Sequence, residues 1–159
     1  MNTQTQDLEQ RAKEMLDMVT RHGVSGIPVD GTTAIQYGLE HGVFDQSAVD
    51  GAQEQYHINR AKEMLDMVTR HGVSGIPVDG TAIQYGLEHG VFDQSAVDGA
   101  QEQYHINRAK EMLGMVTRHG VSGTPVDRKA LVYGVLNNIF THKDIVRAQS
   151  QYKANVVKK

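Results

Sequence analysis

Residues 60–107 read RAKEMLDMVTRHGVSGIPVDGTAIQYGLEHGVFDQSAVDGAQEQYHIN, and residues 11–59 carry the same sequence with one additional threonine. A third stretch begins at residue 108 with RAKEMLGMVTRHGVSGTPVD and then diverges. We name these stretches copy 1 (residues 11–59), copy 2 (60–107) and copy 3 (108–159). A repeat of this length is one supersecondary unit used again, so it predicts a chain built from equivalent units. The near-identity of copies 1 and 2 indicates a recent or engineered duplication, because independently drifting copies would differ at many surface positions.

The composition excludes several classes of protein. The chain has 159 residues, and we predict one domain over residues 1–159 whose units are the three copies. It contains no cysteine, so it has neither a disulfide framework nor a thiolate metal site. We find no apolar run long enough to cross a membrane, and no apolar stretch after Met1 of the kind found in export signals. We therefore expect a cytoplasmic protein without a membrane partner.

Copy 1 shows how each unit is built. Residues 12–22 place apolar side chains at helical spacing, and Gly23 follows as a residue that can close the helix in a left-handed conformation. Pro28 then disfavours helix at the residue before it, so a loop is expected. A short helix follows and is closed by Gly42. In copy 3 this glycine is replaced by Asn138, the next best residue for a left-handed cap.

Polar residues mark the predicted helix starts. One aspartate is expected to cap the short helix of each copy: Asp30, Asp79 and Asp127. The helix that follows has its own expected cap: Asp45, Asp93 and Thr141. No proline interrupts residues 45–71 or 93–119, so each stretch is predicted to be one long helix. A bend near residues 57–60 is the competing interpretation, because the apolar stripe rotates there.

These patterns predict an all-α fold. We expect about seven helices, long and short in alternation, that form an elongated array or bundle, and an exchange of segments between chains is an open alternative. Each short helix carries an alanine and a glycine on one face, which predicts the close approach of another helix: Ala34 and Gly38, Ala82 and Gly86, Ala130 and Gly134. The extra threonine of copy 1 is expected to be absorbed by a new cap at Thr32, which leaves Ile35 in register with Ile83.

The sequence offers little catalytic or metal-binding chemistry. Glu54 and His57, like Glu102 and His105, have the spacing of di-iron carboxylate bundles, but they lie off the apolar stripe and are expected to face water. The histidine before each loop is expected to serve helix capping: His22, His71 and His119. No phosphate loop or nucleophile motif occurs. We therefore predict no enzyme, no cofactor and no metal site.

Charge is divided unevenly along the chain. Residues 1–107 hold 6 Lys and Arg against 16 Asp and Glu, whereas residues 108–159 hold 10 against 3. The last helix, residues 141–157, is expected to bury Ile145, Ala148, Tyr152 and Val156. Basic residues of copy 3 are the candidates for contact with an anion, a nucleic acid or another partner: Arg128, Lys129, Lys143, Arg147, Lys153, Lys158 and Lys159.

Two functions remain open at this point. The first is a non-enzymatic helical tandem-repeat protein with a structural or protein-binding role, whose partner is protein and includes itself as a homo-oligomer. The alternative is a small DNA- or RNA-binding protein that acts through the basic residues of copy 3, since two helices joined by a short turn can enter a major groove. The acidic copies would repel phosphate, so the first function is preferred.

Overall fold

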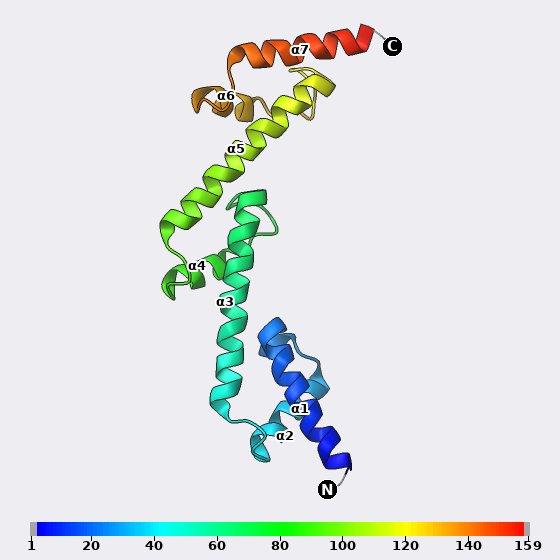
Figure 1. The fold of residues 1–159 in the computed structure, drawn as a ribbon, viewed down its shortest axis with the longest axis vertical. Helices are drawn as coiled ribbons and strands as arrows, with labels where there is room; N and C mark the ends of the chain where they lie inside the picture. Colours follow the sequence, from blue (N-terminus) through cyan, green and yellow to red (C-terminus); the bar gives the residue numbers. More distant parts are fainter. Residues whose placement is uncertain (1–2, 158–159) are drawn as a thin grey trace. The chain divides into compact units, whose positions relative to one another are not determined.

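The computed structural model describes residues 3–157, and this part of the chain contains seven α-helices, a short 3-10 helix and no strand (Figure 1). The helices are α1 (Thr3–His22), η1 (Val24–Gly26), α2 (Val29–Glu40), α3 (Gln46–His71), α4 (Gly80–Glu88), α5 (Gln94–His119), α6 (Arg128–Leu136) and α7 (His142–Val157). The all-α prediction and the expected alternation of long and short helices are therefore confirmed for the described residues.

The helices form two compact units. Compact unit 1 extends to Met64 and includes Asp79–Asp93, and compact unit 2 consists of Leu65–Val78 and the residues from Gln94 onwards. The first boundary, between Met64 and Leu65, falls inside α3, and the other two lie directly before α4 and α5. A single helical repeat domain over residues 1–159 stays a prediction.

The two long helices run without interruption through the junctions between copies. α3 and α5 each contain 26 residues, and they pass through Asn59 and Asn107 respectively. The predicted continuity of both long helices is therefore confirmed, and the competing bend near residues 57–60 is not found in α3. The apolar stripe changes face as expected: α5 buries Val97 near its start and Met112 near its end. Each long helix therefore contributes its first half to one copy and its second half to the next.

Left-handed residues close the helices where the sequence predicts them. Gly23, Gly72 and Gly120 have φ angles of 76°, 79° and 79°, directly after the RH pair of each copy. Gly42 and Gly90 close the first two short helices with φ angles of 69° and 67°. Asn138 is the non-glycine residue with positive φ in residues 3–157, at 59°, which confirms that asparagine replaces glycine in this cap.

Each compact unit has its own hydrophobic core. In compact unit 1, α1, α2 and the start of α3 bury six side chains together: Met15, Val19, Ala34, Ile35, Val49 and Ala52. In compact unit 2, α6 and α7 pack on the second half of α5 and bury an equivalent set: Ala109, Met112, Val116, Ala130, Leu131, Phe140 and Ala148. Copies 1 and 3 therefore use the same apolar positions to hold three helices together.

The small residues of the short helices contact an aromatic ring rather than another helix. A side chain built on Gly38, Gly86 or Gly134 would overlap the ring of the phenylalanine six residues later, which is Phe44, Phe92 or Phe140. The predicted helix–helix approach is wrong at these glycines, because the loop after each short helix folds its phenylalanine back over the glycine. The alanines of the pairs are buried, as expected for that face.

The extra threonine of copy 1 lengthens α2 at its start. α2 has 12 residues and α4 has 9, yet Ile35 and Ile83 are 9% and 7% exposed, so the downstream register is kept as predicted. The predicted cap at Thr32 is wrong, because α2 already begins at Val29. The amide of Thr32 donates instead to the carbonyl of Pro28 at 3.3 Å.

Asp30 is consequently not an N-cap. It lies inside the first turn of α2, where its carboxylate accepts a hydrogen bond from Arg11 Nη2 at 2.7 Å. Asp79 and Asp127 do cap α4 and α6, and each carboxylate accepts from a backbone amide two residues later at 3.0 Å. One inserted residue thus exchanges a side-chain cap for additional helical hydrogen bonds in copy 1.

Candidate functional site

One polar contact recurs in all three copies at the loop that follows the first helix. Gln53, Gln101 and Gln149 each accept a hydrogen bond through Oε1 from the backbone amide of a loop valine: Val24, Val73 and Val121 respectively. All three distances are 2.7 Å. In each copy, this hydrogen bond connects the helix that carries the glutamine to the loop that follows the preceding long helix.

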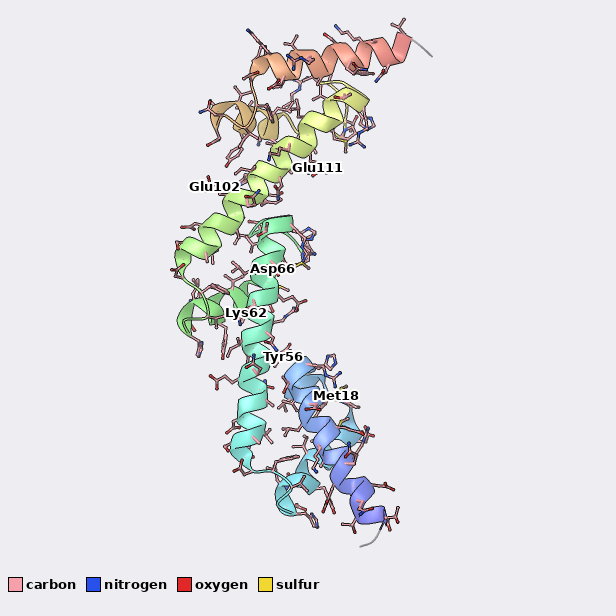
Figure 2. The ribbon with its side chains drawn as sticks, viewed as in Figure 1. Met18, Tyr56, Lys62, Asp66, Glu102 and Glu111 are labelled. Atoms are coloured by element: carbon pink, nitrogen blue, oxygen red, sulfur yellow. The ribbon has the colours of Figure 1, made fainter. Side chains whose placement is uncertain are left out.

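A tyrosine reinforces the same contact. Tyr56, labelled in Figure 2, comes from α3, and its ring packs against Gly23. Tyr104 and Tyr152 pack in the same way against Gly72 and Gly120. We name this arrangement of glutamine, tyrosine and loop glycine the loop joint. Sequence reasoning missed it, although Gln, Tyr and Gly are retained at these positions in copy 3, where the surrounding residues change.

A contact between a histidine ring and a tyrosine ring links successive copies. The ring of His57 lies 5.1 Å from that of Tyr85 in compact unit 1, and the ring of His105 lies 5.2 Å from that of Tyr133 in compact unit 2. Each histidine also lies 3.2 Å, nitrogen to nitrogen, from the amide of its loop-joint glutamine. The expectation that His57 faces water is wrong, because it is half-buried between these groups.

The Glu-x-x-His pairs do not assemble into a metal centre. Within residues 3–157, no group of three or more His, Asp or Glu side chains gathers at ligating distance. Glu54 and Glu102 point to solvent, while the histidines beside them contact glutamine and tyrosine. The histidines of the RH pairs are exposed in the last turn of their helices, and the left-handed glycine after each closes the helix: His22, His71 and His119.

The basic candidates of copy 3 are spread over two helices. Arg128 and Lys129 open α6, and Arg128 Nη2 donates to Ser122 Oγ at 3.2 Å. Lys143, Arg147 and Lys153 are exposed on α7, and Arg147 Nη1 lies 3.5 Å from Asp144 Oδ1. Lys158 and Lys159 lie outside the described residues. The structure therefore exposes the described basic side chains of α7 but distributes them around the helix.

Two aspartates at helix starts have lowered pKa values. The Asp144 carboxylate accepts two hydrogen bonds from Thr141, one from its amide at 2.9 Å and one from its hydroxyl at 3.2 Å. These bonds, together with the nearby Arg147 guanidinium, hold the pKa of Asp144 below its usual value. The Ser47 hydroxyl and the Ala48 amide lower the pKa of Asp45 in the same way. Both carboxylates cap the start of a helix, which confirms the cap predicted at Asp45.

The end of α7 departs from the sequence prediction. Ala148 is buried and Ile145 and Tyr152 are half-buried, as expected, but Val156 is 53% exposed. The prediction fails because α7 is held at Tyr152, by its contact with Gly120, and its last turn extends beyond this point. The apolar stripe alone does not show where the packing partner ends.

A groove with apolar walls lies between α6, α7 and the loop at Val121. Its volume is about 480 Å³, and six apolar side chains line it: Val121, Leu131, Val132, Val135, Leu136 and Ile145. Arg128 and His142 complete the lining. We name it the α6 groove. Sequence reasoning missed it, although Val132 and Leu136 replace Gln84 and Glu88 of copy 2.

The sequence matches no protein-family model, no curated protein and no solved structure. Among the described helices, none is both long and apolar enough to span a membrane. The features that bear on function are the loop joints, the exposed basic residues of α7 and the α6 groove.

Proposed function

We propose that this chain is a non-enzymatic helical tandem-repeat protein, of engineered or recently duplicated origin, with a structural or protein-binding role that includes association with further copies of itself. The loop joint carries this proposal. Because the same glutamine–amide bond recurs three times at 2.7 Å, each copy has an equivalent way of closing on itself. The cytoplasmic location, which is expected because the sequence has no long apolar run and no export-signal pattern, belongs to the same proposal.

Repeat architecture suits binding better than catalysis. Units that contact chiefly their neighbours generate long surfaces on which partners can lie, and their stability is roughly a sum of unit and junction contributions. The helix junctions through Asn59 and Asn107 and the His–Tyr contacts at each junction supply such nearest-neighbour coupling.

Self-association is favoured by the division of charge. Residues 1–107 carry a net charge of −10 and residues 108–159 one of +7, so the acidic part of one molecule attracts the basic part of another. This attraction is screened over roughly 10 Å at 0.1 M salt. Head-to-tail association should therefore weaken as salt is raised.

Sedimentation velocity over a concentration series tests this proposal. We expect the average mass to fall between about 0.02 M and about 0.3 M salt. The combined variant Lys143→Gln, Arg147→Gln and Lys153→Gln should lower the mass at low salt. The matched control is Lys13→Gln, Lys62→Gln and Lys110→Gln, which removes the same charge from equivalent exposed positions of the three copies. A mass that is independent of salt, or equal effects of both variants, would contradict head-to-tail association through α7.

Nucleic-acid binding is the second candidate, and the exposed basic residues of α7 favour it: Lys143, Arg147 and Lys153. Its affinity for duplex DNA would fall steeply with salt, with a slope set by the number of phosphates contacted. Fluorescence anisotropy with a labelled duplex measures this directly. Tight binding of duplex by a protein that stays monomeric at all salt concentrations would reverse our ranking of the two functions.

A further inference from the structure

The surface of the short helix changes character between copies. In copies 1 and 2 it carries a hydrogen-bonded pair of polar side chains: Gln36 Nε2 donates to Glu40 Oε1 at 3.0 Å, and Gln84 Nε2 to Glu88 Oε1 at 2.9 Å. In copy 3 the equivalent residues are Val132 and Leu136, which are 56% and 75% exposed. An i, i+4 pair of exposed aliphatic side chains that borders a groove is typical of a binding surface rather than of an ordinary helix face.

We propose that the α6 groove docks an amphipathic helix of a partner protein that carries acidic residues beside its apolar anchors. An amphipathic helix places anchors at i, i+3, i+4 and i+7 into such a groove. Val132 and Leu136 on α6 and Ile145 on α7 supply the complementary apolar walls. The inference names a partner class for the protein-binding role proposed above and rests on that role.

Charge selects an acidic partner. Arg128 and His142 line the groove, no lining residue is acidic, and Lys129 and Lys143 directly follow them in the sequence. The nearest acidic residues in the sequence are engaged elsewhere. Asp127 caps α6 and lies 3.7 Å from Arg108, and Asp144 accepts from Thr141. Cations at the edge of an apolar groove favour acidic flanks on the partner and raise its rate of association.

The same charges disfavour two other occupants. A second copy that paired symmetrically, with one α6 groove against the other, would bring Arg128 against its own counterpart, and like charges in an interface are costly. A bilayer surface would meet the cations, but it cannot fill a concave groove. An acidic amphipathic helix satisfies both the apolar walls and the charged edge.

The chain supplies its own matched variants. V132Q combined with L136E reproduces the surface of copy 2, where the equivalent Gln84 and Glu88 are compatible with the same fold. R128G combined with K129T reproduces the start of α4, which removes the two cations of α6 and keeps the apolar walls. Circular dichroism melting of both variants checks that the fold is retained.

The probe is a fluorescein-labelled synthetic peptide with leucines at i, i+4 and i+7 and glutamates on its other face, measured by fluorescence anisotropy with the full chain. We expect saturable binding that V132Q/L136E weakens at least about tenfold, since each buried aliphatic side chain contributes that much affinity. R128G/K129T should weaken binding several-fold and reduce its dependence on salt. A scrambled peptide of the same composition should not bind.

Besides a failure of the peptide to bind, four results would overturn the proposal. These are equal binding to wild type and V132Q/L136E, stronger binding of the peptide with lysine in place of glutamate, self-association that V132Q/L136E abolishes, and binding to phosphatidylserine vesicles without binding to the peptide. If the peptide fails while the mass still falls with salt, the groove inference is wrong and the proposed self-association stands. If the mass is independent of salt while the peptide binds, the proposed self-association is wrong and the groove inference stands.

Discussion

Copies 2 and 3 share an interior and differ in their surface. Both keep the loop-joint glutamine, the tyrosine on the loop glycine and the phenylalanine under the short helix. Their short helices nevertheless present opposite surfaces, a Gln84–Glu88 hydrogen bond in α4 and exposed Val132 and Leu136 in α6. The difference teaches that a few contacts define the unit, while the outward positions are free to acquire a binding surface.

The first prediction tests whether copies 2 and 3 depend on the continuous helix that joins them. We expect Asn107→Pro in α5 to cost about 3 kcal/mol or more, because proline removes a helical hydrogen bond and clashes with the preceding turn. Urea unfolding followed by circular dichroism measures the loss. Gln94→Pro is the control, since the first turn of a helix tolerates proline. Equal losses from the two variants would mean that continuity through Asn107 does not matter.

The second prediction asks whether the two interiors are equivalent. We expect Gly86→Ala and Gly134→Ala to lose similar stability, about 1–3 kcal/mol each, because the added methyl overlaps the ring of Phe92 or Phe140. Gly99→Ala lies in open space within α5 and should instead stabilise the chain by up to about 1 kcal/mol. Thermal unfolding of the three variants makes the test. A clear loss in only one of the first two would show that the copies pack differently.

The sequence predicted those parts of the fold that depend on local chemistry. Helix closure at Gly120 and at Asn138 follows from which residues accept positive φ, and both are found. The cap at Asp127 is equally local and is also found. The cap predicted at Asp30 is wrong because a helix can begin either at a side-chain cap or further upstream with additional backbone hydrogen bonds. With one extra residue, the short helix of copy 1 is three residues longer than that of copy 2.

The parts that were missed depend on contacts between elements. Nothing near Gln149 in the sequence indicates that its side chain reaches the amide of Val121, and periodicity does not say that Phe140 folds back onto Gly134. The basic residues of the candidate site could be named from composition. The α6 groove required the packing of α6 against α7, although the replacement of Gln84 and Glu88 by aliphatic residues was a readable signal.

The third prediction concerns the loop joint. Gln149→Ala removes the acceptor for the Val121 amide and should cost about 1 kcal/mol. Gln101→Ala should cost slightly more, because Gln101 also contacts His105, whereas copy 3 has Lys153 at that position. Hydrogen exchange of the Val73 and Val121 amides should speed up in the respective variants.

Gln103→Ala is the control for the loop joint. It removes only an exposed hydrogen bond to Asn107 within α5, which is worth about 0.2–0.5 kcal/mol. The loop joint would not stabilise copy 3 if Gln149→Ala left the exchange rate of the Val121 amide unchanged. The same would follow if it lowered the free energy of unfolding no more than the control does.

The smallest expected effect is the pH dependence of stability that comes from Asp144 at the start of α7. Hydrogen bonds from Thr141 hold the pKa of Asp144 below its ordinary value of 3.8, so ionised Asp144 stabilises the folded state. That contribution is complete above the unfolded pKa and is lost as pH falls through the lower, folded value. Copy 2 has Ala96 at the equivalent position, so this contribution is specific to copy 3. Thermal midpoints from pH 5 to pH 2 should therefore fall less steeply in Asp144→Asn than in the wild type. Parallel slopes for wild type and Asp144→Asn would show that this cap carries no measurable linkage to folding.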